Sequence, residues 1–158
     1  MGIFMEKKKR RRGIKRHESL QPLSRHHMVA LHLGLKLRRA GSDESRLTNE
    51  EIKQEVIDFW EPDGQQHFRE EEEILLPTYA QHASIEKPEI TEMLQEHVKI
   101  RALIDRIISA EGIELDAMHE LGSLLEVHVR KEERIIFPMI EKALPEDVLQ
   151  KMAPYLHE

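Results

Sequence analysis

The chain contains no cysteine among its 158 residues, and this absence removes several classes of chemistry. Without thiols there can be no disulfide framework, no thiolate nucleophile and no iron–sulfur ligation. Any metal ion must therefore be held by nitrogen and oxygen atoms. Glycine and proline are scarce, with seven of each, and aromatic residues make up only 4% of the chain, whereas good helix formers dominate. This composition favours an all-α fold.

Long apolar segments are missing as well. No run approaches the roughly 20 residues that a membrane span needs, and the N-terminus lacks the apolar core of a secretory signal. We therefore expect a cytoplasmic protein without a membrane span. The length suits a single domain with a sizeable buried core.

Charge is distributed unevenly along the chain. Residues 1–17 hold eight of the 24 Lys and Arg residues and one acid, which leaves 16 basic against 29 acidic side chains in the remainder. The run from Lys7 to Arg12 repels itself and contains nothing apolar. We therefore expect residues 1–16 to form a flexible, disordered basic tail and residues 17–158 to form the domain. Because no aromatic residues interleave with the charges, a solvated tail is favoured over a phosphate-binding arm for nucleic acid or anionic lipid.

Turn signals divide the domain into four long helices and a short fifth. The long helices are expected over about residues 20–39, 49–76, 88–110 and 115–143, and the short one over about 146–156. Thr48 and Glu51 form a capping box that begins the second helix. This helix is expected to kink or break briefly at residues 61–64 and to stop before Pro77. Pro138 is expected to kink the fourth helix, and the fifth should fold back over one end of the bundle.

Two eleven-residue stretches, which begin at His67 and His128, align without a gap, and each contains the pattern His-x-x-x-Glu. The two pairs are His67 with Glu71 and His128 with Glu132. On a helix of about 3.6 residues per turn, a His and a Glu four residues apart lie on one face. Each pair can therefore reach the same metal ion.

Every long helix places one histidine on its apolar stripe, where residues recur at steps of three and four. The stripes, in chain order, are Leu20, Leu23, His27, Ala30, Gly34 and Leu37; Val56, Trp60, His67, Glu71 and Ile74; Ile90, Met93, His97, Ile100, Ile104 and Ile107; and Met118, Leu121, Leu125, His128, Glu132, Ile135 and Met139. We therefore expect four histidines and two carboxylates to point into the core.

A lone histidine on an apolar stripe is more often a satisfied core residue than a ligand. Four histidines with two carboxylates are a different case, because each carboxylate would cost several kcal/mol if buried without a compensating charge. A central cation supplies that charge. Salt bridges from Arg69, Arg101 or Arg130 are the structural alternative, but Arg69 and Arg130 stand two residues after a candidate ligand and point away from it. The donor set suits iron, manganese or zinc rather than calcium or magnesium.

These residues resemble the hemerythrin-like family, whose domain is also called the HHE cation-binding domain. The resemblance covers about residues 17–143 and rests on His27, on His67 with Glu71, on His97, and on His128 with Glu132, in that order on successive helices. It implies an up-down-up-down four-helix bundle around a non-haem, oxo- or hydroxo-bridged centre of two iron ions. Glu71 and Glu132 would bridge the ions, and the histidines would cap them, with His27 joining one His-x-x-x-Glu pair and His97 the other. Zinc and manganese are the alternative metals.

Two departures from the family pattern limit what the resemblance implies. Oxygen carriers of the family have a second histidine four residues from the third-helix ligand, but Met93 and Arg101 occupy the positions that flank His97. The missing fifth histidine leaves more open coordination and disfavours reversible oxygen carriage. His26 stands where relatives often have an acidic or amide residue, and it is an alternative ligand or a partner of one. Four acids beside the candidate ligands are expected to be solvated: Glu70, Glu72, Glu73 and Glu133. Of these, Glu70 or Glu133 could instead orient a ligand imidazole.

The expected function is that of a non-catalytic di-iron protein that binds dioxygen, nitric oxide or a related small oxidant for sensing, storage or iron handling. Two alternatives stay open. One is an enzyme-like protein that reduces nitric oxide or peroxide, or supplies iron for iron–sulfur repair, although the sequence shows no electron route. The other is a metal-free or zinc-bound helical interaction module.

Overall fold

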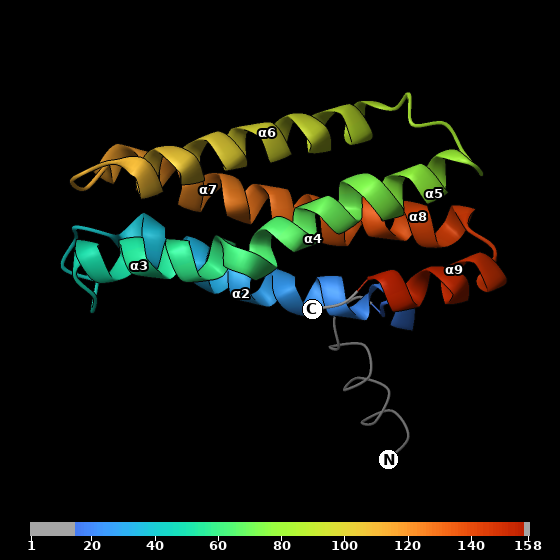
Figure 1. The fold of residues 1–158 in the computed structure, drawn as a ribbon, viewed down its shortest axis with the longest axis horizontal. Coiled ribbons are helices and arrows are strands. Elements are labelled where there is room, and N and C mark those ends of the chain that lie inside the picture. Colours follow the sequence, from blue (N-terminus) through green and yellow to red (C-terminus); the bar gives the residue numbers. More distant parts are fainter. Residues whose placement is uncertain (1–14, 157–158) are drawn as a thin grey trace, which may run out of the picture.

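A computed structural model describes residues 15–156, and this part of the chain is all-α, without a strand. Four long helical segments run alternately up and down as a bundle, and a short fifth helix lies against one end of it (Figure 1). The first long segment is α2 (Gln21–Arg39), and the second consists of α3 (Asn49–Phe59), α4 (Gln65–Glu70) and α5 (Leu76–Ala80). The third is α6 (Pro88–Ser109), and the fourth consists of α7 (Leu115–Lys131) and α8 (Phe137–Ala143). The short fifth helix is α9 (Glu146–Met152). The four-helix bundle with a short C-terminal helix expected from the sequence is confirmed.

The predicted basic tail lies outside the described residues except for Lys15 and Arg16. Arg16 is buried, and its guanidinium donates hydrogen bonds to Glu141 Oε1 at 2.9 Å and to the backbone carbonyl of Glu133 at 2.6 Å. The contacts of the bundle therefore extend to Arg16. Within residues 15–156 no helix combines the length and the apolar character needed to cross a membrane. The cytoplasmic location stays a prediction.

Three π-helical segments interrupt the second and fourth long helices. They are η2 (Trp60–Gly64), η3 (Glu71–Leu75) and η4 (Glu132–Ile136). The first coincides with the predicted kink, where Glu61 has non-helical angles of φ −114° and ψ 122°. The other two begin at the carboxylate of each His-x-x-x-Glu pair. A π turn inserts one residue into the α-helical repeat and is found mostly at functional sites.

The inserted residue corrects the expected end of the second helix. The helix does not stop before Pro77 but continues through it to Ala80 as α5. A proline has no N–H to donate, and Pro77 stands in the first turn after a π segment, where that missing donor is tolerated. Pro138 has the same place at the start of α8, after η4.

The inserted residue also shifts the apolar stripe by one position. Leu75 and Ile136 are fully buried, whereas Ile74 is partly buried and Ile135 is 46% exposed. The prediction that Ile135 faces the core is therefore wrong, and Ile74 is only partly buried. The predicted stripes assume a regular period of three and four residues, which a π turn breaks.

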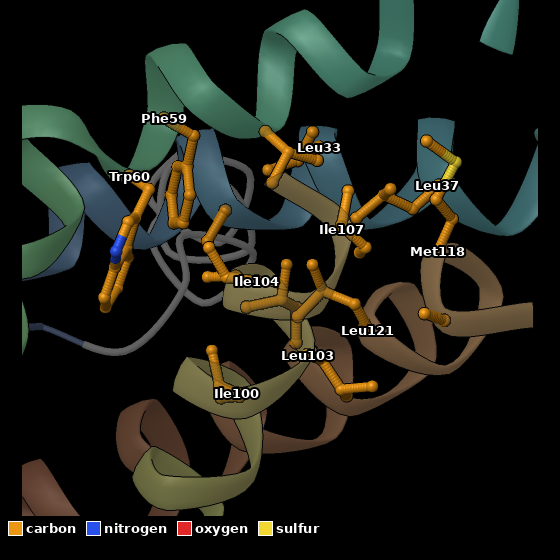
Figure 2. Packing of buried hydrophobic residues seen from close by; sticks show 14 of the residues in the cluster. Leu33, Leu37, Phe59, Trp60, Ile100, Leu103, Ile104, Ile107, Met118 and Leu121 are labelled. Carbon is orange, nitrogen blue, oxygen red and sulfur yellow. The ribbon is translucent and has the colours of Figure 1, made fainter. Parts of the chain in front are cut away.

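Apolar side chains fill the bundle in two clusters, one toward each end. The first packs α2, α3, α6 and α7 around residues such as Leu37, Ile104 and Leu121 (Figure 2). The second joins the start of α2 with α5, α8 and α9, and its members include Leu20, Tyr79, Phe137 and Leu149. Where the clusters meet along each long helix, the inward position is a histidine. A polar layer therefore divides the core.

A close helix crossing sets the spacing beside this layer. A Cβ atom on Gly122 of α7 would lie 2.7 Å from the backbone oxygen of Gly34 on α2, so a side chain there would push the helices apart. The two glycines allow α2 and α7 to approach closely. His27 on α2 is thereby held within reach of Glu132, which follows α7.

Candidate metal centre

The six predicted ligand side chains meet at the middle of the bundle. They are His27 from α2, His67 from α4, Glu71 at the start of η3, His97 from α6, His128 from α7 and Glu132 at the start of η4. All six are buried, and none is more than 5% exposed. The structure thus brings together every residue that the sequence proposes as a ligand. Their role as ligands stays a prediction.

The six side chains form two groups that share both carboxylates. The first group contains His27 and His67, the second contains His97 and His128, and each includes Glu71 and Glu132. In either group, one ligand atom from each residue can be chosen so that all of them lie within 4.8 Å of one another. Metal–ligand bonds of about 2.0–2.2 Å place opposite ligand atoms roughly 4.4 Å apart. Each group therefore has the spacing that could hold one cation.

Two of the short contacts in this layer are not aligned as hydrogen bonds. His128 Nε2 lies 2.9 Å from Glu132 Oε2, and His97 Nε2 lies 3.0 Å from Glu71 Oε1. Although these distances are short, His128 Nε2 and Glu71 Oε1 therefore have no hydrogen-bond partner among the described residues. Buried polar atoms nearly always have a partner. Donor atoms that crowd together without pointing at one another fit a ligand set directed at a shared cation.

The outer nitrogens of three imidazoles bind further carboxylates. The bonds join His27 Nδ1 to Glu133 Oε2 at 2.6 Å, His97 Nδ1 to Glu72 Oε2 at 2.7 Å, and His128 Nδ1 to Glu96 Oε1 at 2.7 Å. Such bonds fix the ring orientation, keep Nε2 directed inward and make the imidazole a stronger ligand. They are characteristic of metal-bound histidines.

These carboxylates include residues that the sequence reasoning missed. The sequence pattern predicts a solvated Glu72 and gives no sign of the contact that Glu96 makes, whereas it does offer Glu133 as a partner for an imidazole. A signal was present, because Glu72 and Glu133 occupy matching places directly after the two inward carboxylates of the repeat. Glu70 is buried as well, at 4% exposure, and accepts a hydrogen bond from Gln66 at 2.8 Å, so the expectation that it is solvated is wrong.

Arginine side chains do not supply the compensating charge. Within residues 15–156, the three arginines considered as alternatives pair with other acids: Arg69 with Glu73, Arg101 with Glu72 and Arg130 with Glu126. The salt-bridge alternative for the two central carboxylates is therefore not what the structure contains. The countercharge must come from the imidazoles or from a cation.

Protonated imidazoles balance the carboxylates when no cation is bound. Burial by itself lowers the pKa of His27, but hydrogen bonds to Glu132 and Glu133 outweigh it and raise the pKa to about 10. Burial also lowers the pKa of His97 and His128, but the neighbouring carboxylates outweigh it and raise the pKa of His97 to about 11 and that of His128 to about 9. Burial would raise the pKa of Glu132, but its histidine neighbours hold it well below its usual range. A metal ion must displace these protons in order to bind.

Chelator-treated protein is expected to lose stability as the pH rises above about 6.5. The folded-state pKa values of His27, His97 and His128 exceed the ordinary value of 6.5, so the native state binds more protons than the unfolded state. Its stability then falls progressively toward about pH 9–11. Glu72 and Glu133 have lowered pKa values, so their contribution disappears in the opposite direction, below about pH 4.5.

Urea unfolding of the chelator-treated protein between pH 4 and 10 measures this dependence. The free energy of unfolding should be greatest near pH 5–6 and should fall on both sides. Metal-loaded protein serves as the control, because the ions replace the protons and the alkaline decline should disappear. A free energy that stays level from pH 6 to 9 in metal-free protein would contradict the proposed charge balance.

His26 lies beside the site but belongs to neither group of candidate ligands. Its ring stacks on Phe59 with centroids 5.3 Å apart and an interplanar angle of 16°, and it lies 4.9 Å from the ring of His67. Of the two adjacent histidines, His27 is the one that joins a group of candidate ligands, as its place on the stripe predicts.

Two phenylalanines cover the faces of imidazole rings. Phe68 stacks on His97 with centroids 4.0 Å apart and an interplanar angle of 9°, and Phe137 stacks on His27 at 5.3 Å and 20°. Both phenylalanines are buried. They limit the access of water and large molecules to the layer of ligands.

Comparison with known families identifies the same region of the chain. A family model described as the hemerythrin HHE cation binding domain matches residues 19–140, a span that includes all six candidate ligands. Searches of curated proteins and of solved structures gave no significant match.

Proposed function

The chain belongs to the hemerythrin HHE cation-binding domain family, and we propose that it is a di-iron protein. Glu71 and Glu132 would bridge the two ions. The observation that carries this proposal is that two groups of buried ligand atoms share both carboxylates. His27 and His67 would hold one ion, and His97 and His128 the other.

The donor set supports iron. Imidazole nitrogen combined with carboxylate oxygen suits iron, manganese and zinc, whereas calcium and magnesium prefer oxygen alone. Carboxylates that project inward from facing helices hold di-iron centres in other helical bundles. Two bound cations would also supply the positive charge that the two buried carboxylates need and would use the ligand atoms that lack hydrogen-bond partners, His128 Nε2 and Glu71 Oε1.

We infer that the centre binds dioxygen, nitric oxide or a related small oxidant, in sensing, storage or iron handling. Each group offers four protein ligands, and an iron ion that takes more than four ligands would keep a position open for a molecule from solution. Bound iron would supply a redox-active centre to which such a molecule can coordinate. The protein would orient the imidazoles through Glu72, Glu96 and Glu133 and exclude water through Phe68 and Phe137.

Burial of the centre supports a small ligand rather than a larger substrate. All six candidate ligands are at most 5% exposed, and phenylalanine rings cover two of the imidazoles. A diatomic molecule can diffuse through a packed bundle more readily than an organic substrate can. The geometry therefore supports a small oxidant as the ligand, whether it is bound or turned over, and the spectroscopic and turnover measurements below separate these two roles.

Metal analysis combined with an optical spectrum tests the proposal on protein purified without added metal. We expect about two iron ions per chain, as in other carboxylate-bridged bundles, and charge-transfer absorption that changes when azide or nitric oxide is added. Zinc alone, or a metal-free protein without such absorption, would contradict it. Sustained turnover of peroxide or nitric oxide with a reductant would replace the non-catalytic role with the enzyme-like alternative.

A further inference from the structure

The two halves of the centre are related by the internal repeat of the sequence. In the repeat, His67, Glu71 and Glu72 correspond to His128, Glu132 and Glu133. In the two ligand groups, His27 takes beside His67 the place that His97 takes beside His128. The outer hydrogen bonds follow this relation. Glu133 binds His27 Nδ1 at 2.6 Å, and its counterpart Glu72 binds His97 Nδ1 at 2.7 Å.

The relation fails at one position. His128 Nδ1 bonds to Glu96, the residue directly before His97, at 2.7 Å. The matching residue in the other half directly precedes His27, and it is His26 rather than a glutamate. Correspondingly, His67 Nδ1 is buried and has no hydrogen-bond partner among the described residues.

The environments of the two matching residues differ further. Glu96 is buried and paired with Lys131, which also contacts Glu92. The ammonium group of Lys131 therefore fixes the Glu96 carboxylate, whose other oxygen bonds to His128. His26 instead places a flat ring 4.9 Å from the ring of His67 and stacks on Phe59. One half of the centre has an imidazole where the other has an anchored carboxylate.

We propose that His26 makes the two metal positions unequal, so that the position of His27 and His67 holds its ion more weakly and exchanges it first. This inference rests on the proposed di-iron function. Carboxylate partners orient ligand imidazoles and raise their basicity, and the loss of one typically lowers metal affinity 10–100-fold. Three of the four candidate ligand histidines have such a partner, and His67 is the exception.

A surface groove lies on the side of the weaker position. Its volume is about 360 Å³, and its lining includes Ser24, His27, Met28 and Glu133. Glu133 both lines the groove and holds His27 Nδ1. Exchange of the weaker ion with solvent is expected through this groove.

The test titrates chelator-treated protein with Co²⁺ as the probe, by calorimetry and by the visible absorption of the bound ion. Repulsion between the ions alone makes the second bind more weakly, so the decisive quantity is the change in the ratio of the two dissociation constants. His26→Glu supplies the missing carboxylate and should lower the weaker constant 10–100-fold. His32→Glu is the matched control, because it makes the same change at an exposed position of α2 and should leave both constants unaltered.

A spectroscopic readout separates a positioning role from a merely structural one. In Zn²⁺-loaded protein labelled with ¹⁵N-histidine, His26→Glu should give the His67 Nδ1 proton the downfield shift of a hydrogen bond to carboxylate, as the other three ligand histidines should already show. Glu96→Gln is a second variant, and it tests the proposal even if His26→Glu does not fold. It should raise the dissociation constant of the tighter position by about 10-fold and leave that of the weaker position unchanged.

The outcomes for the two proposals are distinguishable. If the wild type binds fewer than two Co²⁺ ions, the proposed binuclear centre fails. If two ions bind with equal constants, or if both His26→Glu and Glu96→Gln leave the ratio unchanged, only the inferred inequality fails.

Discussion

Replacing Glu132 with glutamine is expected to release both metal ions, whereas replacing His128 with alanine should release one. Glu132 belongs to both groups of candidate ligands, and its oxygens lie 2.8 Å from His27 Nε2 and 2.9 Å from His128 Nε2. Removing one partner of a buried charge pair costs about 3–5 kcal/mol, which corresponds to more than about 100-fold in affinity. Because the amide is neutral and nearly isosteric, the variant removes the charge with little change of shape.

The comparison is made by metal analysis of the two variants after gel filtration. Glu126→Gln provides a matched control, because it makes the same change on α7 at a partly exposed residue that pairs with Arg38 at 3.0 Å. It should retain the wild-type metal content. A Glu132→Gln protein that keeps both ions would show that the carboxylate is not shared, and a His128→Ala protein that loses both would show that the two positions do not bind independently.

Removal of the metal should lower the midpoint of thermal unfolding by more than about 10 °C. The candidate ligands form a polar layer across the middle of the apolar core, and an ion that binds only the native state stabilises it by about 2.7 kcal/mol when its free concentration is 100 times the dissociation constant. Two such ions contribute roughly twice that value. For a domain of this size, each kcal/mol shifts the midpoint by about 2–4 °C.

Calorimetric scans with and without a chelator at pH 7.5 measure this shift. The Glu132→Gln variant is the control for direct effects of the chelator, because it is expected to have lost its metal and its midpoint should not move. Equal midpoints for wild-type protein in both scans would mean that protonated histidines stabilise the core as well as metal ions do. The stabilising role assigned to the ions would then be wrong.

The inward-facing residues could be predicted because helical periodicity is local. Each histidine falls on a run of apolar residues spaced by three and four, and a helix that buries those residues must bury the histidine with them. His97, for example, lies between Met93 and Ile100, and all three are at most 1% exposed. The regular period failed only beyond Glu71 and Glu132, where π turns insert a residue and move burial from Ile135 to Ile136.

The outer carboxylates were harder to predict because their partners lie on other helices. Glu72 follows the inward Glu71 and is turned away from it by about 100° around the helix axis, which is also where a solvated residue would stand. Only the position of α6 brings Glu72 against His97. Glu96 meets His128 for the same reason, since α6 and α7 pack side by side.

Local patterns in the chain therefore decided the all-α fold, the four helices, the identity of the six candidate ligands and the face of each helix on which they lie. Packing alone decided that three imidazoles are held by acids from neighbouring helices and that the fourth faces His26 instead. The physical reason is that periodicity sets the direction of a side chain relative to its own helix axis. Distances between helices depend on how all the side chains pack together, and a contact such as that of Gly34 with Gly122 has no signature in either helix alone.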